Sequence, residues 1–342
     1  MGNFNNKNNS NLNMNNIEKN INNCYINASL QTFLHLNDFI TDVRSIKIKD
    51  NKKDNMKLTF EFKKLINQYI NENNFIARNI NPIEIKKILS EINEKYKYNY
   101  QEDANEFITI FLNEMMKEVK GIGIKDIKPI KIPDDDKSKI AFSKLEIKFF
   151  NENKSFLTNL FYGRFKKEII CPKNHIIKVS FEVYNMIQLP IKKGEENKEY
   201  TIEEYLKKFQ EKRIIESEIE CEECKKNDFY YSKTTIYNLP YYIILLLNHQ
   251  LIKYNEHFTI DVKEFFENKN ENNNDKYELV GIIGYYGNYK TGHYFTKCKI
   301  NNENWIHYYS DKYFQVKSYL KMAPREEAIL FFKKCKTDFS NC

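Results

Sequence analysis

Cys24 begins a segment with the apolar spacing of a helix, in a region that is otherwise rich in asparagine. In "CYINASLQTFLHL", residues 24–36, apolar side chains recur on one face of the predicted helix. The first turn of a helix has unpaired N–H groups and a partial positive charge, so a thiol placed there ionises more easily. Cys24 is therefore a candidate nucleophile. The alternative is a small buried residue, which free cysteines often are.

A thiolate nucleophile needs a base, and the base needs a group that orients it. His35 lies three turns further along the same predicted helix and cannot reach Cys24, whereas His293 follows a glycine and precedes a predicted strand. Ser310 and Asp311 follow the next aromatic strand, and adjacent strands would place Ser310 beside His293. These residues could form a cysteine–histidine–polar triad. Alternatively, His293 caps a turn and the Ser310–Asp311 pair makes a tight turn.

The elements that must position these residues change in kind along the chain. Residues 24–120 show the 3.6-residue period of helices, and strands are expected from about residue 145 onward. A helical first third followed by a strand-rich remainder predicts an α+β fold rather than an alternating parallel sheet. The expected strands lie within 155–172, 175–191, 233–254 and 277–334.

Charge, apolar run length and cysteine count indicate which classes of protein are not favoured. The 342 residues carry a net charge of +7 in segments of mixed sign, without a basic stripe interleaved with aromatics, so nucleic-acid binding is not indicated. The longest apolar run, 241–247, is far too short to span a bilayer. Seven cysteines and no visible secretory signal predict a reducing compartment, cytoplasm or nucleus, where cysteines are free, catalytic or metal-bound. Nothing implies an oligomer, and a monomer is expected.

Several motifs occur in the order found in a known family. The segment "NCYINASLQ" (23–31) is close to "TCYMNSxLQ", and "QEDANEF" (101–107) is close to "QQDAHEF". Other segments resemble the family's entry to the fingers, palm strand, histidine box and closing strand: "LFYGRFKKEIIC" (160–171), "NLPYYIILLLNH" (238–249), "YELVGIIGYYGNYKTGHYF" (277–295) and "EEAILFFKK" (326–334). From about residue 17 to 334 the chain therefore resembles the ubiquitin-specific proteases, a class of cysteine deubiquitinases.

The resemblance implies an α+β fold with a papain-like core. A helical thumb is expected over about 17–125, and β-strand fingers with a β-rich palm over about 145–336. The catalytic domain would span 17–336, after a disordered asparagine-rich tail at 1–16 and before a short tail at 337–342.

The resemblance also implies a reaction and a partner. Cys24 would attack the carbonyl of the terminal glycine of ubiquitin, His293 would act as general base, and the thioester would then be hydrolysed. Gln101 and Asp103 fall where the family contacts the ubiquitin tail, and an acidic Asp103 suits that basic tail.

Two departures from the family pattern concern catalysis. The third triad position reads Ser310–Asp311 where the family has Asp or Asn before a second Asp, and a hydroxyl orients an imidazole without stabilising imidazolium as a carboxylate would. The upstream oxyanion donor is an Asn in the family. Here that position is Lys19 without a gap, or Asn20 if the loop is one residue shorter; the backbone N–H of Cys24 should contribute as well.

A third departure concerns a metal site in the fingers. The family has two CxxC pairs that bind zinc, and here Cys221 and Cys224 are present while Asn174 replaces the second cysteine of the first pair. Because structural zinc accepts three thiolates and one imidazole, Cys171, His175, Cys221 and Cys224 could form one tetrahedral site. The alternative is a degenerate site without metal.

Three other functions stay open. A displaced oxyanion Asn and Ser310 would suit a pseudoenzyme that binds ubiquitin without cleaving it. The same fold could process a ubiquitin-like modifier. A zinc-dependent binding module outside the family would need the cysteines of the fingers but not Cys24.

Overall fold

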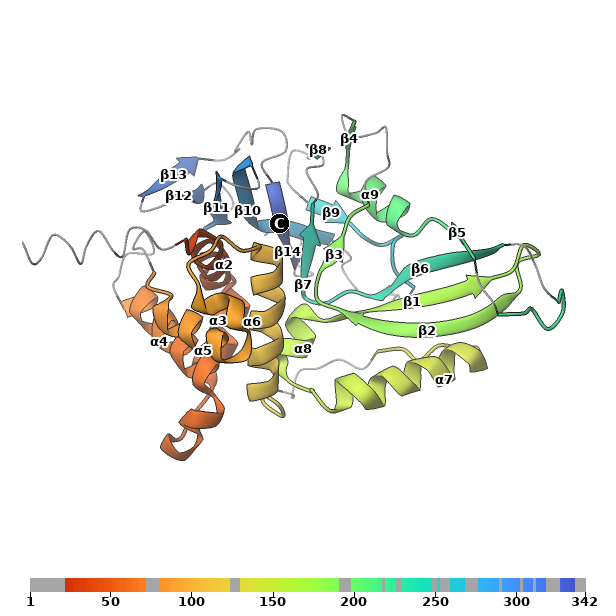
Figure 1. Ribbon diagram of the computed structural model, residues 1–342, viewed down its shortest axis with the longest axis horizontal. Helices are drawn as coiled ribbons and strands as arrows, with labels where there is room; N and C mark the ends of the chain where they lie inside the picture. The colour runs from red at the N-terminus through yellow and green to blue at the C-terminus, as the bar shows by residue number, and fades with distance from the viewer. Residues whose placement is uncertain are drawn as a thin grey trace, which may run out of the picture.

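The computed structural model describes residues 22–71, 80–123, 130–190, 198–216, 219–225, 229–247, 251–252, 259–267, 276–288, 291–301, 304–309, 312–317 and 327–335. Within these ranges the chain has a helical part, a central sheet that lies above it in Figure 1, and a second sheet that projects to the right. We refer to them as the thumb, the palm and the fingers.

The thumb is built from helices that cover one face of the palm (Figure 1). Its helices are α2 (Cys24–Leu34), α3 (Asn37–Ser45), α4 (Lys57–Asn71), α5 (Ile83–Ile92) and α6 (Ala104–Glu118), with short 3-10 turns at Asp50–Asn55 and Glu94–Lys97. α2 is its central helix, because nearly every residue from Tyr25 to Leu34 is buried. Phe33 stacks on Phe111 with ring centroids 5.2 Å apart, which anchors α2 against α6.

The palm is a mostly antiparallel sheet whose central strands are covered on both faces. Its strands follow the order β13 (Lys312–Lys317), β12 (Asn304–Tyr309), β11 (Thr291–Lys299), β10 (Lys276–Asn288), β14 (Glu327–Lys334), β7 (Tyr242–Leu246) and β3 (Ile187–Gln188), and β9 (Thr259–Asp261) also pairs with β10. In β14, Ile329 and Phe331 join the thumb core, whereas Leu330 and Phe332 join a second core on the opposite face. Burial on two faces explains why β7 and β14 are continuously apolar instead of alternating.

The fingers are a four-stranded sheet over which α7 lies (Figure 1). Their order is β2 (Ile176–Tyr184), β1 (Gly163–Ile170), β6 (Tyr230–Asn238) and β5 (Arg213–Ile215). The helical elements before β1 are α7 (Asp136–Leu145), a π-helical turn (Glu146–Asn151) and α8 (Phe156–Phe161), while α9 (Ile202–Phe209) precedes β5; β4 (Glu199–Tyr200) pairs with β8 (Leu251–Ile252). Phe142 of α7 packs against Phe181 and Tyr237 of the sheet.

The prediction of strands from about residue 145 onward is wrong for the first part of that region. Residues 146–151 form a π-helical turn and residues 156–161 form α8, and the strand begins only at Gly163. Ser155 and Thr158 form a capping box that starts α8. Periodicity does not separate a short buried helix from a buried strand, so the apolar run misleads.

α9 lies between the expected strands, and its apolar residues recur at the helical spacing i, i+3, i+4 and i+7: Ile202, Tyr205, Leu206 and Phe209. The Thr201 hydroxyl accepts from the Glu204 N–H at 3.2 Å, and the Glu204 carboxylate accepts from the Thr201 N–H at 2.7 Å. This reciprocal pair is a capping box, whose T-x-x-E signature is present in the sequence. The sequence signals for α9 are therefore its cap and its apolar period.

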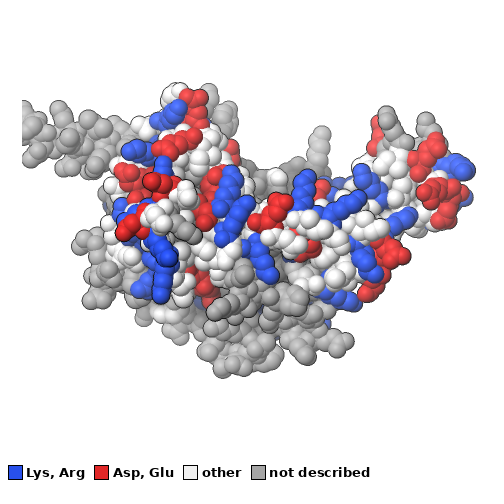
Figure 2. Space-filling model, turned by 90° about the horizontal axis from the view of Figure 1, so that it is seen from below, with Lys and Arg blue, Asp and Glu red and all other residues white. Residues whose placement is uncertain are grey.

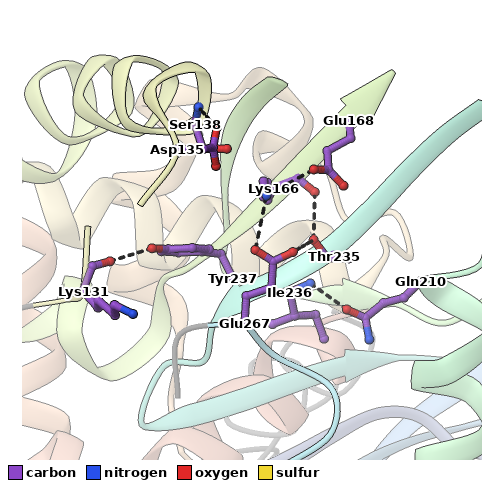
Figure 3. Close-up of polar contacts among 10 residues, drawn as sticks. All are labelled: Lys131, Asp135, Ser138, Lys166, Glu168, Gln210, Thr235, Ile236, Tyr237 and Glu267. Atoms are coloured by element: carbon purple, nitrogen blue, oxygen red, sulfur yellow. Dashed lines mark hydrogen bonds and ion pairs between the residues drawn. The ribbon is translucent and has the colours of Figure 1, made fainter. Parts of the chain in front are cut away.

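A polar cluster ties the base of the fingers to the segment after β9 (Figure 3). The Lys166 ammonium lies 3.1 Å from the Glu168 carboxylate and 3.5 Å from that of Glu267. Thr235 donates to Glu267 at 2.9 Å, and the Glu267 N–H donates to the Ile236 carbonyl at 3.0 Å. Opposite charges around Lys166 thus hold three segments together.

Two surface properties bear on partners. The face in Figure 2 intersperses Lys and Arg with Asp and Glu and shows no stripe of one sign. Across the described ranges, no helix has the length and apolar character to cross a membrane.

Candidate active site

The helix that carries Cys24 packs against the strand that carries His293. Thr32 Oγ1 lies 2.7 Å from Thr296 Oγ1, and Thr296 Oγ1 also lies 2.9 Å from the Ile282 carbonyl. At the start of α2, the Cys24 sulfur lies close enough to the backbone of Tyr294 for this group to lower the pKa of the thiol. Cys24 therefore meets β11 at the residue that follows His293.

The electrostatics of Cys24 differ from the expectation for a thiol at a helix start. Burial raises the pKa of the Cys24 thiol above its ordinary value, and backbone N–H groups, that of Tyr294 first, offset only part of this increase. The predicted lowering of its pKa is thus wrong for the free protein. The helix terminus acts as expected, but desolvation by the surrounding fold is the larger effect.

His293 lies where the ends of β11 and β12 meet. Its ring centroid is 4.8 Å from that of Tyr309, the last residue of β12, and its Nε2 is buried without a hydrogen-bond partner. Burial lowers the pKa of His293, so the imidazole is neutral at pH 7. Among the residues that the structure describes, no hydrogen bond joins Cys24 to His293. Ser310 and Asp311, which directly follow Tyr309, lie outside the described residues, as do Lys19 and Asn20.

Gln101 and Asp103 contact β11 on either side of His293. Gln101 Nε2 donates to the Gly292 carbonyl at 2.6 Å. Asp103 caps α6 by accepting from the Asn105 N–H, and it also accepts from the Tyr294 hydroxyl at 3.3 Å. The two predicted contact residues are therefore next to the candidate catalytic pair.

A buried lysine that no sequence motif indicates fixes the segment before Cys24. Lys86 Nζ donates to Asn23 Oδ1 at 3.0 Å and to Asn99 Oδ1 at 2.9 Å. The Lys86 residue is 8% exposed, and burial lowers the pKa of its ammonium. In the sequence Lys86 is indistinguishable from Lys87, because only the tertiary contact with Asn23 reveals its role.

His35 is tied into a polar contact of its own. Its Nδ1 lies 2.8 Å from the Gln31 carbonyl, and its Nε2 lies 2.9 Å from the Tyr69 hydroxyl and 3.2 Å from that of Tyr308. A carbonyl only accepts, so Nδ1 donates and the single lone pair of Nε2 accepts from one of the two tyrosine hydroxyls at a time. Burial lowers the pKa of His35 to about 4. These contacts hold His35 away from Cys24, as predicted.

The four predicted metal ligands lie together at the tip of the fingers. The ligand atoms of Cys171, His175, Cys221 and Cys224 are all within 4.8 Å of one another. Cys171 Sγ is 3.8 Å from Cys224 Sγ, and His175 Nδ1 is 3.1 Å from Cys224 Sγ. Tetrahedral zinc with bonds of about 2.3 Å to sulfur needs sulfur–sulfur separations of about 3.8 Å. The donor set and its spacing therefore fit a bound metal ion.

The backbone around these ligands explains how Asn174 can replace a cysteine. Asn174 and Lys225 have φ angles of +67° and +63°, a conformation that Asn adopts more readily than most residues. Each closes a tight turn, because its N–H donates to the carbonyl of Cys171 or Cys221. The turn at Asn174 brings the next residue, His175, to the ligand position. His175 Nε2 lies 3.0 Å from Glu223, the outward partner expected of a metal-binding imidazole.

The fold is of the papain-like α+β type. It has a thumb, a palm and fingers, and the thiol at the start of a buried helix packs against the strand that carries His293. The family model described as ubiquitin carboxyl-terminal hydrolase matches residues 15–332. The chain therefore belongs to the ubiquitin carboxyl-terminal hydrolase family, within which its relatives are of the ubiquitin-specific protease type.

Two curated relatives illustrate the similarity. The chain is 23% identical to ubiquitin carboxyl-terminal hydrolase 4 of Saccharomyces cerevisiae (strain YJM789), over 92% of this chain and 38% of the relative. It is 24% identical to ubiquitin carboxyl-terminal hydrolase Usp2 of Drosophila melanogaster, over 81% of this chain and 30% of that protein. The chain thus spans less than half the length of these relatives.

Solved structures confirm the predicted fold. The SAGA Ubp8/Sgf11/Sus1/Sgf73 DUB module bound to ubiquitin aldehyde matches with a TM-score of 0.65 and 18% identity, over 92% of this chain and 68% of that chain. A structure of the yeast SAGA DUB module also matches with a TM-score of 0.65 and 18% identity, over 92% of this chain and 67% of the other.

Proposed function

We propose that this chain is a thiol-dependent deubiquitinase, which hydrolyses isopeptide or peptide bonds at the C-terminal glycine of ubiquitin. The observation that carries the proposal is the contact of Cys24 with the backbone of Tyr294, beside His293. This contact brings a thiol and an imidazole from opposite ends of the chain to one place. Family membership supports ubiquitin as the substrate class.

The first half of the reaction forms a thioester. Cys24 Sγ attacks the carbonyl carbon of the glycine, and His293, neutral at pH 7, accepts the thiol proton. The carbonyl oxygen becomes an oxyanion, to which the Cys24 backbone N–H and the Asn20 side chain would donate. Because burial raises the pKa of the Cys24 thiol, transfer of its proton to His293 has to accompany the attack.

The second half releases the amine and then the ubiquitin. The C–N bond breaks as His293 returns the proton to the leaving nitrogen, and water hydrolyses the thioester with His293 again as base. Ser310 and Asp311 would orient the imidazole. The ring contact between Tyr309 and His293 supports this role, because Ser310 follows Tyr309 directly.

Gln101 and Asp103 would hold the ubiquitin tail beside the thiol. Both are already anchored to β11 around His293, so a tail bound there lies along the candidate catalytic pair. The carboxylate of Asp103 suits the basic tail through charge-assisted hydrogen bonds.

For the metal cluster we propose structural zinc, held by Cys171, His175, Cys221 and Cys224. Bound zinc would join the turn at Asn174 to the loop at 221–225 and so stabilise the tip of the fingers. It takes no part in the chemical step, which occurs at Cys24.

The proposal is tested with ubiquitin that carries a C-terminal propargylamide, which reacts with an active-site thiol. Intact-mass analysis should show one ubiquitin adduct on the purified chain and none on Cys24→Ala. Cys335→Ala removes a thiol outside the site, at the end of β14, and should still form the adduct.

Two outcomes would replace the proposal. Ubiquitin binding without an adduct would indicate a pseudoenzyme. Neither binding nor adduct, but reaction with a probe built on another modifier, would indicate a protease for a ubiquitin-like protein.

A further inference from the structure

Aromatic side chains form an exposed surface on the palm that begins at His293. Tyr286, Tyr309 and Phe314 are 61%, 38% and 53% exposed. We call these three residues, with His293 and His307, the aromatic face.

The strand register places these side chains on one face of the sheet. Tyr286 of β10 pairs with His293 of β11, and His307 of β12 pairs with Phe314 of β13. The His307 ring centroid lies 6.2 Å from that of Tyr309 and 6.5 Å from that of Phe314. Successive residues of a strand point to opposite faces, so Tyr308 points the other way, toward His35.

The aromatic face extends away from the fingers. β12 and β13 form the edge of the palm farthest from β1 and β2, as Figure 1 shows. The residues assigned to the ubiquitin tail, Gln101 and Asp103, approach β11 from the thumb. The aromatic face therefore lies on a different side of His293 from the proposed tail contacts.

Elementary chemistry says which part of the substrate meets His293 from that side. During thioester formation the acyl carbon becomes bonded to Cys24, while the leaving nitrogen must receive its proton from His293. The amine and the residues that flank it are therefore next to the imidazole. The Tyr309 ring centroid lies 4.8 Å from that of His293. Tyr286 is the cross-strand neighbour of His293.

We propose that the aromatic face is the subsite for the leaving group: a lysine side chain of the protein to which ubiquitin is joined, with apolar residues beside that lysine. The inference rests on the proposed deubiquitinase function and assigns a binding surface to the leaving-group side of the substrate. The C–N bond breaks, the Cys24 sulfur keeps the acyl group, and the proton on His293 passes to the lysine ε-nitrogen.

The chemistry of the face suits this occupant. The aliphatic stem of a lysine packs on aromatic rings, and the amine becomes an ammonium after release, which a tyrosine ring attracts. Exposed aromatic side chains next to one another are unusual unless a partner covers them. Phe314 and Tyr286 would contact the apolar flanks, and Tyr309 the lysine stem.

The test compares Phe314→Ser with Tyr313→Ser. These residues are neighbours on the edge strand with similar exposure, 53% and 44%, but they point to opposite faces. Both variants should keep the fold, which thermal unfolding checks. A difference in activity between the two variants therefore reports the contribution of the aromatic face alone.

Two reactions are measured for each protein. One is hydrolysis of ubiquitin joined through an isopeptide bond to a Leu-Lys-Leu peptide, and the other is the rate of labelling by ubiquitin-propargylamide, which has no peptide leaving group. For Phe314→Ser the ratio of isopeptide kcat/KM to labelling rate should fall about fivefold or more. For Tyr313→Ser it should stay within about twofold of the parent chain. A Gly-Lys-Gly peptide should reduce the effect of Phe314→Ser.

Each other outcome overturns the inference in a recognisable way. An unchanged ratio in Phe314→Ser, or an equal fall in both variants, means that the aromatic face is not a leaving-group subsite. Absence of labelling in the parent chain removes the deubiquitinase function itself, and the subsite with it.

Discussion

The side-chain oxygens of Thr32 and Thr296 lie 2.7 Å apart at the buried interface between the Cys24 helix and the His293 strand. Each hydroxyl also lies within hydrogen-bond distance of a carbonyl, that of Ala28 for Thr32 and that of Ile282 for Thr296. The two hydroxyls have one proton each, so at most two of these three contacts are hydrogen bonds at any moment. The contact joins elements 264 residues apart in the chain and keeps the thiol and the imidazole in register.

Thr296→Val tests this contact. The variant should lower the free energy of unfolding by about 1–3 kcal/mol, because a buried hydroxyl loses its partner. Thr32→Val should cost a similar amount, and the double variant less than the sum of both, since they remove one shared contact. Urea denaturation measures all three. Strictly additive costs would show that the two hydroxyls act independently.

The reactivity of Cys24 toward iodoacetamide should increase with pH into the alkaline range. Burial raises the pKa of the thiol, so the thiolate fraction grows about tenfold per pH unit below that pKa. Since burial lowers the pKa of His293, the imidazole is mostly neutral at pH 7, and little imidazolium is there to stabilise a thiolate. Alkylation rates from pH 6 to 10, corrected with Cys24→Ala, provide the measurement. A plateau already reached at pH 7 would indicate a thiolate–imidazolium pair instead.

Lys86→Met should weaken catalysis through Asn23. Without the ammonium, the Asn23 and Asn99 side chains lose their shared donor, so the residue before Cys24 is no longer fixed. We expect kcat with a ubiquitin aminocoumarin substrate to fall about tenfold while KM changes little, and stability to drop by about 1–3 kcal/mol. Lys87→Met is the matched control, because that side chain is exposed on the same helix. Equal effects in both variants would contradict the assignment.

Loss of the proposed zinc should destabilise the fingers. The purified chain is expected to contain one zinc ion, measured by elemental analysis, and Cys224→Ser should lose it and unfold at a temperature lower by several degrees. Cys24→Ala removes a thiol without touching the cluster, so its zinc content should equal that of the parent. A parent chain without zinc, purified in zinc-containing buffer, would indicate the degenerate site.

Lys166→Met should destabilise the base of the fingers by about 2 kcal/mol. The buried Glu168 carboxylate would lose its countercharge, although partial exposure of Glu267 keeps the cost below that of a fully buried pair. Lys167→Met removes the exposed pair with Glu182 and should cost no more than about 1 kcal/mol. Chemical denaturation separates the two values. Similar costs would mean that the Lys166 cluster behaves as an ordinary surface pair.

Local sequence information was sufficient to predict those features of the fold that depend on residues adjacent in the chain. The helix at Cys24 and the strand at His293 follow from short motifs, and the turn at Asn174 suits the backbone preference of Asn. The local sequence predicted a strand at 155–161 where the structure has a helix, because a short apolar run suits a buried helix as well as a strand.

Tertiary structure decided the properties that depend on what surrounds a residue. The direction of the Cys24 pKa follows from burial by distant parts of the chain, which outweighs the helix terminus that the sequence does reveal. Lys86 and His307 look like ordinary polar residues until packing places them beside Asn23 and Phe314. Desolvation and side-chain contact depend on proximity in space, and a linear pattern records only proximity along the chain.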